Sequence, residues 1–323
     1  MFLCEPWWRW PFNLSFPMNP ILAAGFSRTL GLATLAVAVH AATPFRSIHV
    51  GATPESAIPG FNGNLYVTLM GTSRIKGDGD GKIVKIEGDQ VIVFTEGLDD
   101  PKGLVFIDGA LVTADFDKVW AVDASGKKRL LAGPAAFPTP PLFLNDVAIA
   151  PGGTAVLVTD MGNVAAMNAP GGAMWPLDSS EAKNIRPLGR VYRVTLDGKV
   201  SIEVDHAVEM PDPNGIDVLD ANTYLLADFF RGDLLERKGS SWRVVSPDHR
   251  TADGIAHDHS GNIFLTEVRT GKVWKIRLST GEPELLATLP SAADLYLDEA
   301  QHQLIVPDSK SGELVFIPLT SAK

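Results

Sequence analysis

One short pattern recurs six times along the chain, and it restricts the possible folds more than any other feature of the sequence. In most copies a fixed position begins an apolar run, a turn containing Gly or Asp follows, and a second apolar run comes after it. The residues at the fixed position are Glu55, Lys102, Asn145, Asn214, Asp253 and Ala293. Successive copies lie 47, 43, 69, 39 and 40 residues apart. Repeats of about 40–50 residues built from short strands, without a 3.6-residue rhythm, indicate the blades of a β-propeller rather than helical repeats.

The repeat predicts an all-β fold, a single six-bladed β-propeller with a four-stranded antiparallel sheet in each blade. We expect the fixed position near the start of the innermost strand, so that ring closure gathers all six around one axis. The last copy has sequence for only three strands, over residues 295–317. Residues 46–50 should supply the fourth strand of that blade, which would tie the two ends of the chain together and leave no open edge.

The first 41 residues are expected to lie outside the propeller domain of residues 42–323. Arg28 precedes an apolar stretch over residues 30–39, and Val39-His40-Ala41 fits the small-residue site at which a secretory signal peptide is cleaved. The stretch is too short to span a bilayer, which takes about 20 residues. We therefore expect translation to start at Met18 and the mature protein to be periplasmic or secreted; an uncleaved membrane anchor is the alternative.

Composition narrows the possible partners. The net charge of −10 argues against binding to a nucleic-acid backbone and is compatible with attraction of divalent cations. The only cysteine, Cys4, precedes the mature chain, so the exported protein would form no disulfide and would depend on core burial and ring closure. We expect a monomer whose partner is a small-molecule substrate, with no membrane contact after the signal peptide is cleaved.

An insertion at about residues 161–188 accounts for the longest interval between copies. The second strand of a blade ends on the side where the first begins, so this loop should overhang the six fixed positions. Loops of this length in a compact domain are usually functional or disordered. The apolar side chains that would form a lid are Met161, Met167, Met174 and Trp175. A mobile loop is the alternative, favoured by Gly171 and Gly172.

Four of the six fixed positions carry oxygen donors: Glu55, Asn145, Asn214 and Asp253. Two carboxylates and two amide carbonyls suit Ca²⁺ and, less readily, Mg²⁺, Mn²⁺ or another divalent cation. They do not suit Zn²⁺, which prefers His or Cys. Asn, Asp and Gly also begin strands simply as turn residues, and that is the alternative. The register shared by four blades favours a metal site at the axis.

Several other polar residues are candidates for catalysis or metal binding. His257 lies four residues after Asp253, where other blades mostly have apolar residues, so we interpret it as a hydrogen-bonded core histidine. The run at 78–81, Asp-Gly-Asp-Gly, lacks the final Glu of an EF-hand and predicts a hairpin turn instead. The acidic residues expected to support ligands or turns are Asp146, Asp217 and Asp228.

Each of the four oxygen donors lies within a short motif, and the four motifs follow one another in a fixed order along the chain. They are Pro54-Glu55-Ser56, Leu144-Asn145-Asp146-Val147, Pro213-Asn214-Gly215-Ile216 and Ala252-Asp253-Gly254-Ile255-Ala256. With them, the chain from about residue 46 onward resembles the regucalcin/gluconolactonase (senescence-marker-protein-like) family of six-bladed propellers, related more distantly to phosphotriesterase-type and paraoxonase-type propellers. In that family the Glu, the two Asn and the Asp bind one divalent cation, usually calcium. The resemblance therefore implies a calcium-dependent hydrolase of the lactone or ester type.

The chain departs from the family pattern around the expected substrate. Phe143 stands where many gluconolactonases have an Arg used for substrate, and Ser56-Ala57-Ile58-Pro59 replaces a frequent Gly-Pro-Trp run. A substrate more apolar than a sugar lactone becomes plausible. Lys102 at the axis would leave the calcium site positive and favour an anionic substrate or a developing oxyanion. The alternative is a Lys whose amine reaches solvent.

These observations predict a mechanism and one rival. The metal would polarise the substrate carbonyl and lower the pKa of a bound water, with Asp253 as general base and Lys102 stabilising the oxyanion. The rival is a non-catalytic propeller that binds a small ligand or a protein and holds calcium only for structure. An open, water-filled metal position would favour the enzyme, and a site sealed by side chains would favour binding.

Overall fold

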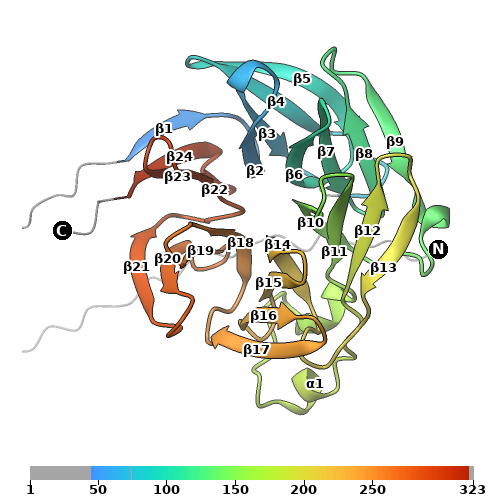
Figure 1. Cartoon of the computed structure of the whole chain (residues 1–323), viewed down its shortest axis with the longest axis vertical. Helices are drawn as coiled ribbons and strands as arrows, with labels where there is room; N and C mark the ends of the chain where they lie inside the picture. The colour runs from blue at the N-terminus through green and yellow to red at the C-terminus, as the bar shows by residue number, and fades with distance from the viewer. Residues whose placement is uncertain (1–44, 74, 320–323) are drawn as a thin grey trace, which may run out of the picture.

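The computed structural model describes residues 45–73 and 75–319, and over these the chain forms six four-stranded sheets arranged around a central axis (Figure 1). The prediction of an all-β, six-bladed propeller is confirmed. Among the described residues, no helix has the length and apolar character needed to cross a membrane. The expected start at Met18 and the cleavage site after Ala41 lie outside the described residues and stay predictions.

Each blade follows the chain from the axis outward. Blade 1 contains β2 (Pro54–Pro59), β3 (Leu65–Leu69), β4 (Gly81–Glu87) and β5 (Gln90–Leu98). Blade 2 contains β6 (Pro101–Ile107), β7 (Ala110–Asp115), β8 (Lys118–Val122) and β9 (Lys128–Ala132). Blade 3 contains β10 (Leu144–Ile149), β11 (Ala155–Asp160), β12 (Arg190–Thr195) and β13 (Val200–Val204). Blade 4 contains β14 (Pro213–Asp220), β15 (Thr223–Asp228), β16 (Leu234–Lys238) and β17 (Ser241–Ser246). Blade 5 contains β18 (Ala252–His257), β19 (Asn262–Glu267), β20 (Lys272–Arg277) and β21 (Pro283–Thr288).

Blade 6 joins the two ends of the chain. Its inner three strands are β22 (Tyr296–Asp298), β23 (Gln303–Asp308) and β24 (Glu313–Pro318), and its outer strand is β1 (Arg46–His49). β1 runs antiparallel to β24, with Arg46 opposite Phe316 and His49 opposite Glu313, and Figure 1 shows the two strands side by side. The predicted closure by the N-terminal strand is confirmed, and unfolding either end must break the ring.

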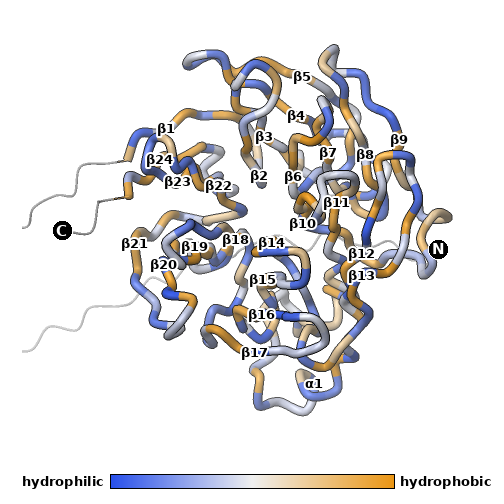
Figure 2. Tube along the Cα trace, in the orientation of Figure 1, coloured by the Kyte–Doolittle hydropathy of each residue, from blue (hydrophilic) through white to orange (hydrophobic). Residues whose placement is uncertain are grey.

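The second strand of a blade is the most buried. Every residue of β11, β15 and β19 is buried, because neighbouring sheets cover both faces of these strands. Apolar side chains of adjacent blades form the cores, and one such cluster includes Val112 of blade 2 with Val158 and Tyr192 of blade 3. Figure 2 accordingly shows hydrophobic residues in every blade rather than in one central cluster. The core therefore lies between blades and leaves the axis to polar groups.

The remaining regular elements are short. They are the 3-10 turns η1 (Phe61–Gly63), η2 (Pro134–Ala136) and η3 (Val164–Met167) and the helix α1 (Ser180–Lys183). η3 and α1 belong to the segment between β11 and β12, where the sequence predicts an insertion. In Figure 1 this segment extends from blade 3 past the strands of blade 4.

Candidate functional site

A β-bulge lies at the fixed position of each of the first five blades. The pairing of the first two strands skips two residues there, for example between Pro54 and Ala57 in blade 1 and between Ala252 and Ile255 in blade 5. The same interruption occurs in blades 2, 3 and 4. The skipped pair is the fixed-position residue and the one after it. Bulges re-aim side chains, and here each bulge frees a fixed position from the strand ladder at the inner end of its blade.

Threonine hydroxyls hold three of these bulges in place. In blade 1, Thr68 Oγ1 accepts a hydrogen bond of 2.9 Å from Ser56 N and donates one of 2.9 Å to the carbonyl of Lys102 in the next blade. In blade 3, Thr159 Oγ1 accepts from Asp146 N at 2.8 Å and donates to the carbonyl of Asn214 at 2.7 Å. A buried hydroxyl thus fixes one bulge and the start of the following blade together.

Small residues after the fixed position let the inner strands approach one another. A Cβ on Gly215 would lie 2.0 Å from the carbonyl oxygen of Asp253, and a Cβ on Gly103 would lie 2.4 Å from Asp146 Oδ1. Such contacts are too short for any side chain, so these glycines are needed for the tight ring rather than for a left-handed backbone. The tight ring is what brings the fixed positions of different blades together.

The four predicted oxygen donors are all buried at the axis, with 2% to 6% of each residue exposed. Glu55 Oε2, Asn145 Oδ1 and Asn214 Oδ1 are fully shielded and find no hydrogen-bond partner among the residues that the structure describes. The amide nitrogens are used elsewhere: Asn145 Nδ2 contacts Met161 Sδ at 2.9 Å, and Asn214 Nδ2 donates to the carbonyl of Ala252 at 3.3 Å. Buried polar atoms without partners are rare and destabilising by about 1–3 kcal/mol each. These three oxygens therefore fit the donor set that a calcium ion requires.

The charges of the site also favour a cation. Burial raises the pKa of Glu55 well above its usual value, the nearby charge of Asp253 raises it further, and Lys102 lowers it. Two carboxylates in a dry ring repel one another unless positive charge lies between or beside them. Over residues 45–73 and 75–319, no cluster of three or more His, Cys, Asp or Glu is placed to hold a metal. The candidate set has only two carboxylates, and its other two donors are amides.

Lys102 is buried, so its amine does not reach solvent as the alternative interpretation required. Its Nζ lies 3.1 Å from Asp100 Oδ2 and 3.1 Å from Met70 Sδ, and 5.1 Å from the centre of the Phe143 ring. Asp100 was not anticipated from the sequence, although it lies two residues before Lys102. Its carboxylate offsets the positive charge, so the expectation of a net positive site omitted this counterion.

A second layer of carboxylates follows the fixed positions. Asp146 accepts hydrogen bonds from Val147 N at 2.7 Å and from Ile216 N, in blade 4, at 2.8 Å. Asp294 accepts one from Ser56 Oγ, in blade 1, at 2.6 Å, and burial raises its pKa to about 6. Burial and the charge of Asp294 raise the pKa of Asp146. Both groups join blades and already have donors, in agreement with a supporting role.

Other sequence-predicted residues have structural partners. His257 Nδ1 lies 2.6 Å from Asp217 Oδ2, and this hydrogen bond raises the pKa of the half-buried imidazole. Asp228 accepts from the backbone N–H of Asp212 at 3.0 Å and of Arg231 at 2.7 Å, which fixes two loops. Asp228 has equivalents in four other blades, because the second strand ends in a buried acid in five of the six blades. These acids are Asp115, Asp160, Asp228, Glu267 and Asp308. The recurrence is visible in the sequence and was missed there.

Three buried side chains are arranged like a Ser-His-acid catalytic triad. Ser246 Oγ lies 3.0 Å from His249 Nε2, and His249 Nδ1 lies 3.2 Å from Glu267 Oε1. All three side chains are buried, and Glu267 also accepts from Trp274 Nε1 at 2.7 Å. With no access for a substrate, the group anchors the loop that precedes Asp253.

The insertion packs over the ring. Met161 and Met167 are buried against Phe230, which follows β15, and Phe143 and Trp175 pack at the edge of the same cluster. Arg250 of blade 5 donates to the carbonyl of Trp175 at 2.9 Å. These contacts support the interpretation of the insertion as a lid, and Met161 itself covers Asn145.

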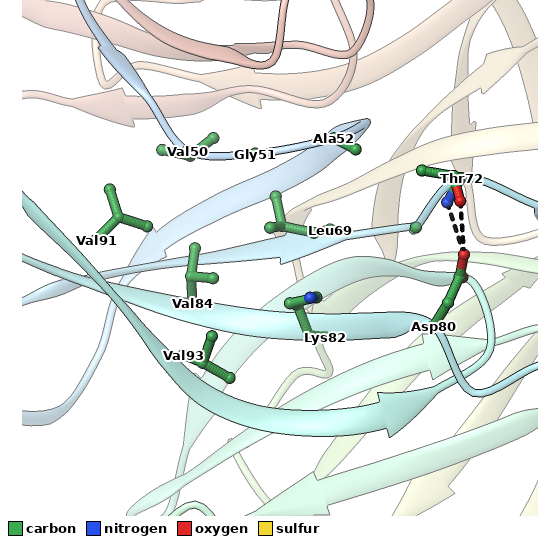
Figure 3. Close-up of a pocket in the computed structure, with 11 residues that line it drawn as sticks. Val50, Gly51, Ala52, Leu69, Thr72, Asp80, Lys82, Val84, Val91 and Val93 are labelled. Carbon is green, nitrogen blue, oxygen red and sulfur yellow. Dashed lines mark hydrogen bonds between the residues drawn. The ribbon is translucent and has the colours of Figure 1, made fainter.

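A separate groove lies between residues 50–52, which follow β1, and strands β3, β4 and β5 of blade 1 (Figure 3). It has a volume of about 360 Å³ and an apolar wall that includes Leu69, Val84 and Val93. At one end Asp80 accepts hydrogen bonds from the backbone and hydroxyl of Thr72. The turn lies at 76–77 rather than at 78–81, where the sequence predicts a hairpin turn, and Gly81 already belongs to β4. The fixed positions do not line this groove.

Comparisons with known proteins identify the fold. No family model matches the chain, and no curated protein matches it in sequence. A solved structure from Xanthomonas campestris, described as a gluconolactonase important in glucose secondary metabolic pathways, is similar with a TM-score of 0.61 and 20% identity. The likeness covers 84% of this chain and 88% of that one. At this identity it shows a shared six-bladed propeller fold.

Proposed function

We propose that the chain is an exported, calcium-dependent hydrolase of lactones or esters. The observation that carries the proposal is that Glu55 Oε2, Asn145 Oδ1 and Asn214 Oδ1 lie buried without a hydrogen-bond partner among the described residues, beside the carboxylate of Asp253. The likeness to a gluconolactonase supports a lactone as substrate. The signal-like pattern over residues 28–41 supports export.

The residues have distinct roles in the proposed reaction. Glu55, Asn145, Asn214 and Asp253 would hold one Ca²⁺, or another divalent cation such as Mg²⁺ or Mn²⁺. The bound cation would polarise the substrate carbonyl and favour deprotonation of water. Asp253 accepts the proton of water as the water oxygen bonds to the carbonyl carbon. The carbon–oxygen bond of the ester then breaks, and the proton passes to the departing oxygen.

Lys102 stabilises the negative charge that develops on the carbonyl oxygen. Asp100 holds the ammonium group in place, with 3.1 Å between Asp100 Oδ2 and Lys102 Nζ. The ring of Phe143 and the thioether of Met70 keep water away from that ammonium group, which strengthens its interaction with an oxyanion. A pre-oriented donor of this kind is commonly worth about 10²–10³-fold in turnover.

One observation favours the alternative of a non-catalytic propeller that binds a small ligand or a protein around a structural calcium. The four donor side chains are almost closed off by the surrounding ring and lid. Catalysis then requires the lid or the methionines to move, whereas structural binding of a cation does not.

The decisive experiment is a turnover assay of the purified mature protein with lactones, aryl esters and phosphotriesters, in calcium and in chelator. Hydrolysis that is lost in chelator and restored by Ca²⁺ supports the proposal. Calcium binding in calorimetry without turnover of any of these substrates would favour the alternative. Absence of calcium binding would refute both.

A further inference from the structure

A second set of residues lies at the same end of the blades as the fixed positions, because the last residue of each second strand pairs with the residue before a fixed position. It consists of the residue that follows the second strand of each blade. These six residues, called the collar below, are Met70, Phe116, Met161, Phe229, Val268 and Ser309. Backbone hydrogen bonds tie the collar to the segments that lead into the inner strands. Examples are Met161 N to the carbonyl of Phe143 at 2.9 Å and Val268 N to the carbonyl of Thr251 at 2.9 Å.

The collar is apolar where the ring of fixed positions is polar. Five of its six members are Met, Phe or Val. Two of them touch the candidate site: Met70 Sδ lies 3.1 Å from Lys102 Nζ, and Met161 Sδ lies 2.9 Å from Asn145 Nδ2. Anything that reaches the site from this side must displace or pass these thioethers. Methionine is unbranched and flexible, so it adapts to apolar groups of different shapes.

Phe116 has a backbone conformation that is unfavourable for its residue type. Its φ is 54°, in the left-handed region that a bulky residue rarely adopts and that glycine adopts freely. Its ring packs edge-on against Phe143 at 5.8 Å between centroids, and Phe143 in turn lies beside Lys102. Strain of this kind tends to gather at functional sites. The turn between β7 and β8 therefore retains an aromatic group at a position where glycine would be relaxed.

Ser309 is the polar exception in the collar. It is more than nine-tenths buried, and its Oγ has no hydrogen-bond partner within the part of the chain that the structure describes. An unused buried hydroxyl suits one polar atom of a ligand, such as a ring or carbonyl oxygen. One hydroxyl among apolar neighbours gives a substrate few polar contacts in this layer.

We infer that the collar selects lactones or esters that carry an alkyl or aryl substituent, in preference to polyhydroxylated sugar lactones. This inference rests on the proposed hydrolase function. A sugar lactone would bury several hydroxyl groups against thioethers and phenyl rings, where they lose hydrogen bonds to water without replacement. An alkyl or aryl group instead removes apolar surface from water on both sides.

The first test is a series of γ- and δ-lactones with alkyl substituents of increasing length, compared with gluconolactone, in calcium. Burial of each methylene should raise kcat/KM about threefold to fourfold until the collar is filled. Gluconolactone should be the poorest substrate. A flat series, or faster turnover of gluconolactone, would overturn the inference and leave the hydrolase proposal intact.

Two variants make the test specific to the collar. Phe116→Gly suits the left-handed backbone, so it should fold, yet it should reduce the gain per methylene. His302→Gly is the matched control, since His302 has a φ of 49° in the turn between β22 and β23, outside the collar. It should leave the series unchanged. Ser309→Ala should lower kcat/KM by a similar factor for every member of the series, because it removes one polar contact.

A binding assay separates the two proposals if no substrate is hydrolysed. Alkyl-substituted and polyhydroxylated lactams have the ring of the substrate but resist hydrolysis, and calorimetry in calcium gives their affinities. Tighter binding of the alkyl lactam without any turnover would refute the hydrolase and support the apolar collar. Equal affinities, or tighter binding of the polyhydroxylated lactam, would refute the collar as a selector.

Discussion

Asn214→Ala gives the sharpest test of the candidate metal site. In wild type, a calcium ion that binds only the folded protein stabilises it by mass action. The gain is about 2.7 kcal/mol when free calcium is 100 times its Kd, and about 4.1 kcal/mol at 1,000 times. For a domain of this size, that corresponds to a rise in Tm of about 5–7 °C. Asn214→Ala removes one of the oxygen donors, so most of this rise should disappear.

The same substitution should have little effect in chelator. Asn214 Oδ1 is a buried oxygen without a partner among the described residues, and its removal relieves a penalty of about 1–3 kcal/mol. The loss of packing and of the 3.3 Å hydrogen bond to the carbonyl of Ala252 acts in the opposite direction. The two effects largely offset one another, and we expect a net change within about 1 kcal/mol.

The measurement is thermal unfolding of wild type and variant, each in excess calcium and in excess chelator. Asn262→Ala is the matched control, because Asn262 Oδ1 is likewise buried without a partner in the described chain, but on β19 away from the fixed positions. Asn262→Ala should shift Tm equally in both buffers. If Asn214→Ala also shifts Tm equally in both, or if calcium leaves wild type unchanged, Asn214 is a structural turn residue and the metal assignment is wrong.

Three further predictions concern Asp253, the Lys102–Asp100 pair and His257. Asp253→Asn keeps an oxygen donor but loses the proton acceptor. Lactone turnover should therefore fall about 10²–10⁴-fold, while calorimetry shows only modestly weaker calcium binding. Turnover equal to wild type would exclude Asp253 as the base. Lys102→Met leaves the buried carboxylate of Asp100 unpaired and should lower the free energy of unfolding by about 3–5 kcal/mol, measured by urea titration. Adding Asp100→Asn to this variant should recover most of the lost free energy. No recovery in the double variant would count against this ion pair. Hydrogen bonding to Asp217 raises the pKa of His257 in the folded protein, so its contribution to stability is present below about pH 6.5 and is lost as pH rises through the raised value. His257→Gln should reduce that loss in unfolding titrations from about pH 6 to 9, and an unchanged slope would contradict the assignment.

The fold could be predicted from the sequence because its causes are local. Glycine and aspartate turns separate short apolar runs, and the side-chain period of a strand sets which residues face a neighbouring blade. The incomplete last copy also indicates that Arg46–His49 must supply the final strand, and this pairing with β24 is observed. The recurring acid at the end of the second strand was equally open to prediction, since Asp160 and Asp228 occupy the same place in their repeats.

The positions of the candidate ligands also follow from the repeat, since Glu55 and Asn214 share one register in different blades. What their atoms contact does not follow. The carboxylate of Asp100 meets the amine of Lys102, and the thioether of Met161 covers Asn145, because of side-chain directions set by the bulges. A sequence pattern gives the face of a strand on which a residue lies, but not the rotamer or the partner chosen there.

The sequence by itself therefore determined the number of blades, the closure of the ring and the kind of side chain at each fixed position. Tertiary structure alone decided which of these groups became buried and which kept a partner. Ser56 and Asp294 are 238 residues apart and form a hydrogen bond only because the last blade returns to the first. The collar exists for the same reason, since Met70 and Phe229 come from different blades and share a layer only once the ring has closed. Local interactions set each strand, whereas burial and pairing at the axis depend on all six blades being in place.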